Sequence, residues 1–365
     1  MKNTYGQALT VTLFGESHGE AIGAVIDGLA PGIKIDTAYI DEKLALRRPS
    51  GKISTSRAEK DNYMIASGIF NGYTTGTPIT VIIPNENTKS KDYSKFKELP
   101  RPSHADYTAE CKYHGFQDYR GGGHFSGRIT AALVAAGAII SQALEAVGIK
   151  IGTHISKLHG ITDRAFENFD SDIELLSKKI FPVLSDNAEV KMRDEIEKAR
   201  ADGDSVGGVL ESVILGIPAG VGEPWFDSME SVISHILFSI GGIKGVEFGD
   251  GFALADMLGS EANDSFAKED GRVVTKTNRN GGINGGITNG MPIIVRCAVK
   301  PTPSIYKEQD TVNLSKMENA RLKIEGRHDP AIIHRARAVV DAALAIATAD
   351  LLTVRFGTDY LANNN

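Results

Sequence analysis

The chain has 365 residues, of which 41% are hydrophobic and 24% charged, so it can bury a large core. By composition, its net charge of −6 excludes a nucleic-acid binder and a membrane-surface protein. Cys111 and Cys297 are too few for a disulfide framework and are not spaced as metal ligands. No signal peptide and no apolar run of membrane-spanning length is recognised, so we expect a cytoplasmic protein. We expect no bound metal, because the spacing of the cysteines does not fit metal ligands.

The first ninety residues are expected to form strands and one helix. His18 lies between two strand-like segments, in a tight turn that is rich in glycine. A histidine there suits acid–base chemistry near neutral pH, although a loop histidine is usually only solvated. The expected elements are strands over 9–14 and 21–27, a helix over 36–48 capped by Asp36 or Thr37, and a hairpin of 64–70 and 77–83 around an Asn-Gly turn.

A group of cations lies at the end of the predicted helix. Arg47, Arg48, Lys52 and Arg57 fall within eleven residues, around a polar Pro-Ser-Gly loop. Arginines in the last turn of a helix interact favourably with the helix dipole, which gives the group an ordinary structural interpretation. The same group suits the binding of a polyanionic small molecule.

Residues 84–119 are polar and show little periodicity, which predicts a long loop. Long loops in compact domains are more often functional than idle. This one carries Arg101, His104, Asp106 and His114 and leads directly into three glycines, so His104 is expected near them. The spacing of histidine and cysteine does not fit a zinc site.

A glycine-rich loop at 120–128 runs into a very apolar segment that begins at about Ile129. Glycines allow the backbone to approach a ligand closely, and His124, Ser126 and Arg128 can contact an anion. A helix that is apolar on every side must be buried, and its N-terminus attracts negative charge. The segment predicts an anion or phosphate site against the core, with a plain glycine turn before a core helix as the alternative.

The remainder alternates strands, helices and glycine-rich turns. Strands are expected over 149–158, 206–217 and 291–299, and helices over 228–240 and within 163–202. The glycines of 241–290 do not fit a dinucleotide-binding motif, and they suggest either tight turns or close packing against a flat ligand. Before the last helix, Asp329 is expected as N-cap and Pro330 as the first helical residue.

Two buried helices, with strands in antiparallel hairpin order around them, predict an α+β fold. We expect a layered sandwich in which a buried helical core lies between antiparallel β-sheets. No linker divides the chain, so residues 1–365 are expected to form one domain whose last few residues are disordered.

Three stretches taken together resemble the signature regions of the chorismate synthase family. They are GESHGEAIGAVIDGLAPG at 15–32, GGGHFSGRITAALVAAGAI at 121–139 and GRHDPAIIHRARAVVDAAL at 326–344. The stretches RPSHADYT at 101–108, GDGF at 249–252, NGGINGG at 280–286 and KPTPS at 300–304 are also similar to that family. The resemblance runs in consistent order from residue 5 to about residue 355.

The resemblance implies a lyase reaction in aromatic amino-acid biosynthesis, at the last common step of the shikimate pathway. 5-Enolpyruvylshikimate 3-phosphate loses phosphate and a ring proton in a 1,4-anti elimination that gives chorismate. Reduced FMN is the implied cofactor, with NADPH or a separate flavin reductase as its source of electrons. A homotetramer is also implied. Two alternatives remain open, a flavin-binding NAD(P)H-dependent reductase and a non-catalytic anion-binding protein.

The resemblance also implies roles for individual residues. His18 would stabilise the departing phosphate, His104 would neutralise the reduced flavin, and Asp329 would assist proton removal. The implied FMN contacts are His124, Phe125, Ser126, Gly241, Gly242, Gly285, Lys300, Pro301, Thr302, Pro303, Ser304 and Arg327. The implied contacts with substrate or NADPH are Arg47, Arg48, Lys52 and Arg128.

The chain departs from the family pattern at two of these places. Residues 124–128 read His-Phe-Ser-Gly-Arg, where many members read Arg-Ser-Ser-Ala-Arg, so an arginine and a serine are missing from the implied FMN loop. Lys52 stands where arginine is common, which keeps the charge but loses the bidentate geometry of a guanidinium.

Overall fold

Two five-stranded antiparallel sheets form the frame of the protein. The computed structural model describes residues 2–49, 51, 53–54, 60–86, 97–324, 326 and 328–362. The first sheet has the order β1 (Thr4–Tyr5), β2 (Thr10–Gly15), β3 (Ala21–Asp27), β7 (Ile79–Pro84) and β4 (Met64–Ser67). The second has the order β11 (Ile243–Phe248), β16 (Ile293–Val299), β10 (Gly208–Leu215), β8 (Lys150–Leu158) and β9 (Ile161–Thr162). The expectation of an α+β fold with antiparallel sheets is confirmed.

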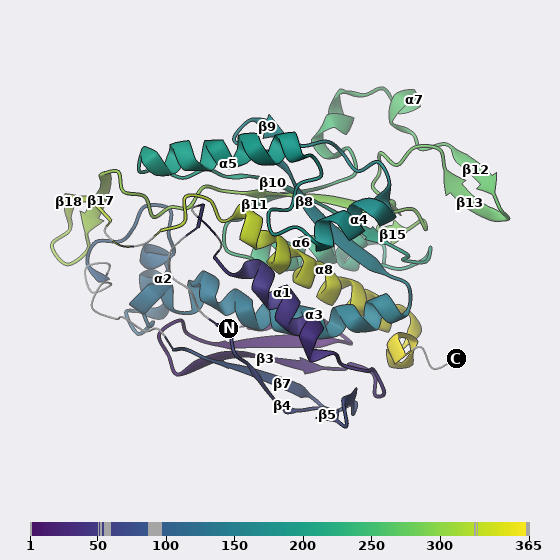
Figure 1. The fold of residues 1–365 in the computed structure, drawn as a ribbon, viewed down its shortest axis with the longest axis horizontal. Coiled ribbons are helices and arrows are strands. Elements are labelled where there is room, and N and C mark those ends of the chain that lie inside the picture. The colour runs from purple at the N-terminus through teal and green to yellow at the C-terminus, as the bar shows by residue number, and fades with distance from the viewer. Residues whose placement is uncertain are drawn as a thin grey trace.

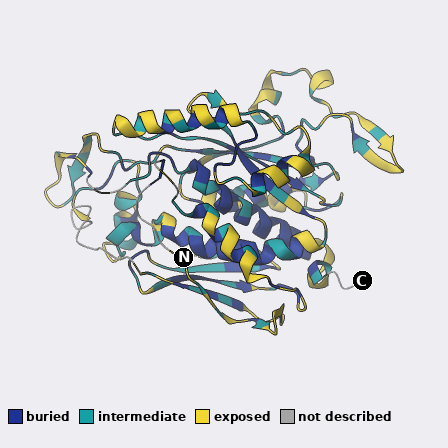
Figure 2. Ribbon diagram, in the orientation of Figure 1, coloured by how far each residue is buried: buried dark blue, intermediate teal, exposed yellow. Residues whose placement is uncertain are grey.

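Helices lie between these sheets (Figure 1). Helix α3 (Thr130–Ala146) packs on the first sheet, and α8 (Ile333–Phe356) packs on α3 and on the second sheet. Helix α1 (Thr37–Arg47) contacts α3 and α8, and α6 (Met229–Ser239) packs on α8 and β11. Helix α4 (Phe169–Ser177) contacts β8, and α5 (Asp186–Ala201) contacts β9 on the outer side of the second sheet (Figure 1). Figure 2 shows that burial is concentrated in this central helical layer.

Helix α3 is buried because its sequence offers almost no polar face. At Gly137 a Cβ would lie 2.3 Å from the Cβ of Ala342, so glycine allows α3 and α8 to approach closely. The helical stretch Gly127–Ala146 is long and apolar enough to cross a membrane by length and composition alone. The expectation that no run reaches that length is therefore wrong for this stretch. Because 72% of its apolar 18-residue window is buried inside the fold, it serves as a core helix.

Several expected local features are present. The Asp36 carboxylate accepts a hydrogen bond from Ala38 N and caps α1. The helix expected over 228–240 is α6, which Ser228 caps by accepting from Ser231 N, a cap that was not predicted. The Asn-Gly turn joins β5 (Ile69–Phe70) to β6 (Tyr73–Thr74). Further hairpins are β12 (Phe266–Glu269) with β13 (Arg272–Thr275), β14 (Ile283–Asn284) with β15 (Ile287–Thr288), and β17 (Gln309–Asn313) with β18 (Glu318–Leu322).

Two local expectations are wrong. The polar segment 84–119 contains a helix, α2 (Asp106–Tyr113), which buries only Ala109 and so leaves no apolar periodicity in the sequence. Asp329 is not the N-cap of α8, because the helix begins at Ile333. Its carboxylate instead pairs with the Arg335 guanidinium at 2.7 Å. A short helix, α7 (Gly259–Ala262), completes the α-helices of the described residues.

The two ends of the chain are joined through Asp350 in α8. Its buried carboxylate accepts hydrogen bonds from the backbone N–H groups of Gln7, Ala8 and Leu9 at 2.9 to 3.0 Å. An unpaired buried carboxylate would be costly, and these amides satisfy it. The last helix therefore anchors the segment that enters β2.

Candidate functional site

His18 lies in the turn between β2 and β3 and is only 6% exposed. The Ser17 hydroxyl lies 3.0 Å from His18 Nδ1 and donates to the Arg120 carbonyl at 3.2 Å. The Ser17 backbone N–H donates to the Gly123 carbonyl at 3.1 Å. The turn is thus bound to the glycine-rich loop, and His18 is held inside the protein and is not a solvated loop histidine.

The three glycines of that loop are required by its shape. Gly121, Gly122 and Gly123 have φ angles of +61°, +86° and +55°, a region that other residues rarely adopt. A Cβ at Gly121 would lie 2.2 Å from the His18 ring, and one at Gly123 would lie 2.0 Å from a carbonyl oxygen. Glycine therefore lets the loop lie directly on His18.

His104 lies against the next glycine of the same loop. A Cβ at Gly122 would be 3.4 Å from His104 Cε1 and 3.6 Å from Nε2. On its other side, His104 Nδ1 lies 2.7 Å from Asp106 Oδ1, and Arg101 donates to the same carboxylate. His18 and His104, which are 86 positions apart in the sequence, thus contact neighbouring residues of one loop.

The residues that follow the glycines have mainly local partners. His124 Nδ1 donates to the Gly15 carbonyl at 2.8 Å, which ties the loop to the end of β2. The Phe125 ring is 45% exposed and packs edge-on against Tyr113. The Ser126 hydroxyl accepts from Arg128 N and caps the short 3₁₀ turn before α3. The structure gives His124 and Phe125 these contacts within the protein, and Ser126 keeps its hydroxyl beside the loop.

A buried cationic cluster lies beside this loop. Asp61 is fully buried and pairs with Arg47 Nη1 at 2.7 Å and with Arg128 Nη1, while Arg48 Nε lies 3.7 Å away. Burial lowers the pKa of Arg47, as do the nearby Arg335 and Arg128, against the opposing effect of Asp61. One carboxylate faces three guanidiniums, so the cluster has a net positive charge and favours an anion.

Asn85 connects the cluster to the His18 turn. Its amide nitrogen donates to the carbonyls of Glu16 and Gly19, each at 2.9 Å, and its oxygen accepts from Arg128 Nε at 3.0 Å. The Arg47 guanidinium also donates to the Gly127 carbonyl at 3.3 Å. The cationic cluster and the glycine-rich loop therefore form one hydrogen-bonded assembly.

Asp329 joins the same assembly through Arg335. The Arg335 guanidinium donates to the Asp329 carboxylate with Nη1 and to the Arg47 carbonyl with Nε, both at 2.7 Å. The carbonyl of the next residue, Pro330, accepts from Val206 N at 2.8 Å. These bonds hold the segment before α8 against the end of α1, where the cationic cluster begins.

Lys300 brings the KPTPS segment and the Gly-Gly pair to the His104 loop. Its backbone N–H donates to the Gly242 carbonyl at 2.9 Å, and its ammonium donates to the Ser103 carbonyl at 2.6 Å. Burial, and the nearby Lys244, lower the pKa of Lys300. Residues 241–242 and 300 thus lie next to the loop that carries His104.

Two features of these segments fit a bound cofactor. A Cβ at Gly241 would meet no heavy atom within 4 Å, so the backbone there borders open space. The Thr302 hydroxyl is buried and has no hydrogen-bond partner within the described chain, although its carbonyl accepts from Ser205 Oγ. A buried polar group without a partner is costly unless a ligand satisfies it. Pro301 packs against Gly207, Ser304 is buried, and Pro303 lies between Thr302 and Ser304.

Not every expected site residue joins this assembly. Gly285 lies in the β14–β15 hairpin, and Gly281, just before that hairpin, accepts a hydrogen bond from Ile294 N near the start of β16. Lys300 follows the other end of that strand, and seven residues at about 3.3 Å each place the two roughly 20 Å apart. The structure therefore does not bring Gly285 to the other implied FMN contacts. Lys52 and Arg327 lie outside the described residues.

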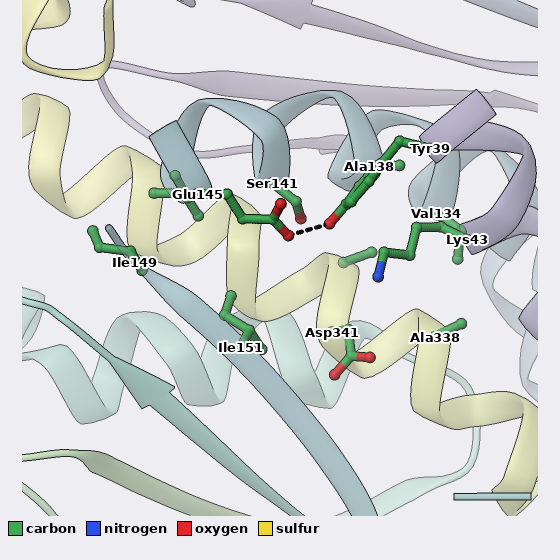
Figure 3. Close-up of a pocket in the computed structure, with 12 residues that line it drawn as sticks. Tyr39, Lys43, Val134, Ala138, Ser141, Glu145, Ile149, Ile151, Ala338 and Asp341 are labelled. Atoms are coloured by element: carbon green, nitrogen blue, oxygen red, sulfur yellow. Dashed lines mark hydrogen bonds between the residues drawn. The ribbon is translucent and has the colours of Figure 1, made fainter. Parts of the chain in front are cut away.

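Two small cavities help to delimit the site. One of about 20 Å³ lies beside His104 and is lined also by Gly122 and Phe125. Another, of about 40 Å³, lies among α1, α3, α8 and β8 (Figure 3) and contains none of the expected site residues. There Tyr39 donates to Glu145, and burial raises the pKa of Asp341. Across the chain's described ranges, no three His, Cys, Asp or Glu side chains are grouped to hold a metal ion.

Sequence reasoning assigned no role to four residues that organise the site. They are Asp61, Asn85, Asp106 and Arg335. A signal was present for Asp61, because buried arginines such as Arg47 and Arg128 require a counter-ion. Asp106 was visible beside His104 in the sequence, as a carboxylate two residues after a histidine. Asn85 and Arg335 act on backbone carbonyls far away in the sequence, which no local pattern indicates.

Comparison with known proteins gives a consistent result. A family model described as "Chorismate synthase" matches residues 9–353. The chain is 47% identical to the chorismate synthase of Pyrococcus abyssi, over 96% of this chain and 97% of that protein. It is 45% identical to the one of Thermococcus kodakarensis, with the same coverage. A solved structure titled "Crystal Structure of Chorismate Synthase" matches with a TM-score of 0.76 and 28% identity, over 97% of this chain and 94% of that one.

Proposed function

The chain belongs to the chorismate synthase family, and from this we propose that it eliminates phosphate from 5-enolpyruvylshikimate 3-phosphate to give chorismate, with reduced FMN as cofactor. The family makes it an enzyme, a lyase acting on a phosphate-containing substrate. The observation that carries the proposal is the placing of His18 and His104 against consecutive glycines of one loop, beside a buried cationic cluster.

The cationic cluster suits the substrate, which carries two carboxylates and a phosphate. Arg47 and Arg128 are fixed by Asp61 and by backbone carbonyls, so little side-chain freedom remains to be lost on binding. Because three guanidiniums share one carboxylate, attraction for an anion remains. We assign Arg47, Arg48 and Arg128 to substrate binding, and Lys52 to the same role or to NADPH contact.

His18 is assigned to the departing phosphate. Negative charge builds on the phosphate oxygen as the carbon–oxygen bond breaks, and a protonated imidazole beside it stabilises that charge. The Ser17 hydroxyl on Nδ1 and the loop packed against the ring fix the imidazole before substrate arrives. Positioning of this kind removes the need to order the side chain during the reaction.

Reduced FMN would supply electron density to the breaking bond and accept the ring proton. In this chain Gly241, Gly242 and Lys300–Ser304 would hold it, with Ser126 and His104 on the loop side. Asp329 would assist the proton transfer, oriented by its ion pair with Arg335. The family's contact set is completed by Arg327, His124, Phe125 and Gly285. Of these, Gly285 is not near the other implied FMN contacts within this chain.

We further propose a single domain with the family's layered sandwich, assembled as a homotetramer in the cytoplasm. One hydrophobic core includes residues of both sheets and the helices between them, which supports a single domain. Large exposed aromatic side chains support association, among them Trp225 at 84%, Phe226 at 89% and Phe252 at 84% exposure. NADPH or a separate flavin reductase would keep the FMN reduced.

The test is phosphate release from 5-enolpyruvylshikimate 3-phosphate under anaerobic conditions with photoreduced FMN. We expect release of phosphate and formation of chorismate in equal amounts, with neither product when the FMN is oxidised. NADPH consumption without an added reductase, measured in parallel, distinguishes a flavin reductase. Consumption of NADPH without phosphate release would contradict the proposed lyase reaction, and the absence of both would leave an anion-binding protein.

A further inference from the structure

The geometry around His104 points to a further residue of the site. We propose that Asp106 is a positioning residue, which holds His104 in one tautomer so that only Nε2, on the side of the glycine-rich loop, exchanges a proton. This inference rests on the proposed function for its consequence in turnover, whereas the holding of His104 is a property of the folded chain alone.

The Asp106 carboxylate is bound from several directions. Oδ2 accepts from Arg101 N at 2.9 Å and from Arg101 Nε at 2.8 Å, and Oδ1 accepts from Arg101 Nη2 at 2.8 Å. Oδ1 also lies 2.7 Å from His104 Nδ1. Burial alone would raise the pKa of Asp106, but the hydrogen bonds from Arg101 and His104 hold it well below its usual range. Asp106 is therefore a carboxylate at any working pH.

A carboxylate can only accept, which decides the tautomer of His104. Nδ1 must carry the hydrogen that Oδ1 receives. Arg101 Nη2 also lies 3.1 Å from Nδ1, but the contact of Nδ1 with the carboxylate oxygen is shorter, at 2.7 Å, and without a hydrogen on Nδ1 it would set two lone pairs against each other. In neutral His104 the lone pair consequently lies on Nε2, the nitrogen next to Gly122. Within the described residues Nε2 has no hydrogen-bond partner, so it remains available to a ligand.

The backbone that carries His104 is held from a second side. Lys300 Nζ donates to the carbonyl of Ser103, whose φ of +59° marks a strained turn. Asp106 itself is the first residue of α2, so the helix fixes where the carboxylate stands. Arg101, only 7% exposed, closes the arrangement on the remaining side. A ring with one fixed nitrogen and a fixed backbone can present Nε2 in only one direction.

Asp106→Asn in the full-length chain is the direct test. Asparagine keeps the size of the side chain but lacks the charge that selects the Nδ1–H form. By ¹⁵N NMR of histidine-labelled protein, we expect His104 to be Nδ1–H in wild type and a mixture of tautomers in the variant. We expect kcat for phosphate release to fall about 10- to 100-fold, the usual range for partners that orient an active group, and KM to change less than about threefold.

Asp172→Asn is the matched control. Asp172 accepts from two nitrogens of Arg164 and from the Glu167 backbone N–H, as Asp106 does from Arg101, but among the described residues no histidine is hydrogen-bonded to it. It should leave the His104 spectrum and kcat unchanged, although it removes an equivalent arginine–aspartate pair. Asp106→Glu, which restores the charge, should recover part of the lost turnover and most of the Nδ1–H signal.

The outcomes separate the two proposals. An unchanged His104 tautomer in Asp106→Asn, or a changed tautomer with unchanged kcat, would overturn the positioning role. The NMR comparison needs no turnover. If wild type released no phosphate, the proposed function would fail, while the holding of His104 by Asp106 would still be decided by the spectrum. A fall in stability that Asp172→Asn reproduces, with no tautomer change, would reduce Asp106 to a structural residue.

Discussion

His104 and His154 are both paired with carboxylates, and the difference between them separates a site from a scaffold. His154 lies in β8 with no exposed surface, and its two ring nitrogens meet Asp163 at 3.0 Å and Glu211 at 3.2 Å. His104 meets Asp106 with Nδ1 only and turns Nε2 toward Gly122. With both nitrogens occupied, a histidine links segments of a sheet. With one nitrogen available, it can exchange a proton with a ligand.

A third histidine, His334, is also buried, but its pKa is shifted in the opposite direction from that of His154. Burial alone would lower the pKa of His154, but the carboxylates of Asp163 and Glu211 raise it above its usual 6.5. His334 in α8 is equally buried but has the Ser54 hydroxyl, at 2.8 Å, in place of a carboxylate. Burial, together with the nearby Arg335 and Arg193, lowers the pKa of His334 to about 3. At similar burial, the charged partners of a core histidine therefore decide whether its pKa lies above or below 6.5.

The largest expected effect is on turnover at the glycine-rich loop. His18→Ala should lower kcat about 10²- to 10⁴-fold, the range for positioned acid–base groups, because the departing phosphate loses its stabilising charge. Thermal unfolding should change little, since His18 lies in a turn and its ring packs against the Gly121 loop. Steady-state phosphate release and a melting curve measure the two. His159→Ala is the control, because that histidine is exposed and its ring pairs with Glu195 on the surface. Unchanged turnover in His18→Ala would remove His18 from the reaction.

The next effect is on stability and should appear in the sheet. His154→Gln leaves Asp163 without its buried cation and Glu211 with Arg296 alone, and removing one partner of a buried ion pair costs about 3–5 kcal/mol. Urea unfolding at pH 6 should show this loss, while kcat per folded molecule is retained. Because the folded pKa of His154 is raised, its stabilisation is complete below pH 6.5 and is lost as pH rises through the folded pKa. The difference from wild type should therefore shrink at high pH, and a difference that grows instead would contradict the charged assignment.

The smallest effect at neutral pH is expected for His334→Gln. Above pH 6.5 His334 is neutral in the folded and the unfolded chain, so its protonation does not affect stability there. Only the loss of the contact with Ser54 then separates the variant from wild type. As pH falls from 6.5 toward about 3, the unfolded chain gains a proton that the folded chain refuses, so wild type loses stability through this group. Urea midpoints at several pH values should fall less steeply in the variant over that window. Parallel slopes would show that another group controls the acid sensitivity.

Much of the frame was predictable because its signals are local. The strand over 21–27 and the cap at Asp36 follow from alternation and from a capping side chain. The buried character of α3 follows from a run without polar residues. The contact of Gly121 with His18 was not predicted as such, because a glycine in the sequence indicates a close approach of the backbone but not which residue it approaches.

The failures share a physical reason, which is that tertiary partners overrode local pattern. Asp329-Pro330 has the form of a helix start, but Arg335 takes the carboxylate and α8 begins at Ile333. Helix α2 is polar on nearly every face, so its sequence looks like a loop. Asp61 gains its role only when Arg128 arrives from 67 residues away. Such pairings depend on the assembled fold, which a single sequence does not display.

Asp350 also sets when the chain can finish folding. Its carboxylate is separated by 343 positions from the Gln7 amide that it binds. A ribosome adds roughly 5–20 residues per second, so the amides at the start of β2 wait tens of seconds for their acceptor during synthesis. The opening segment stays unanchored until the final helix emerges from the exit tunnel. A nascent chain that ends before α8 would therefore lack the helix that packs on α3. It would also lack the carboxylate that binds the backbone at residues 7–9.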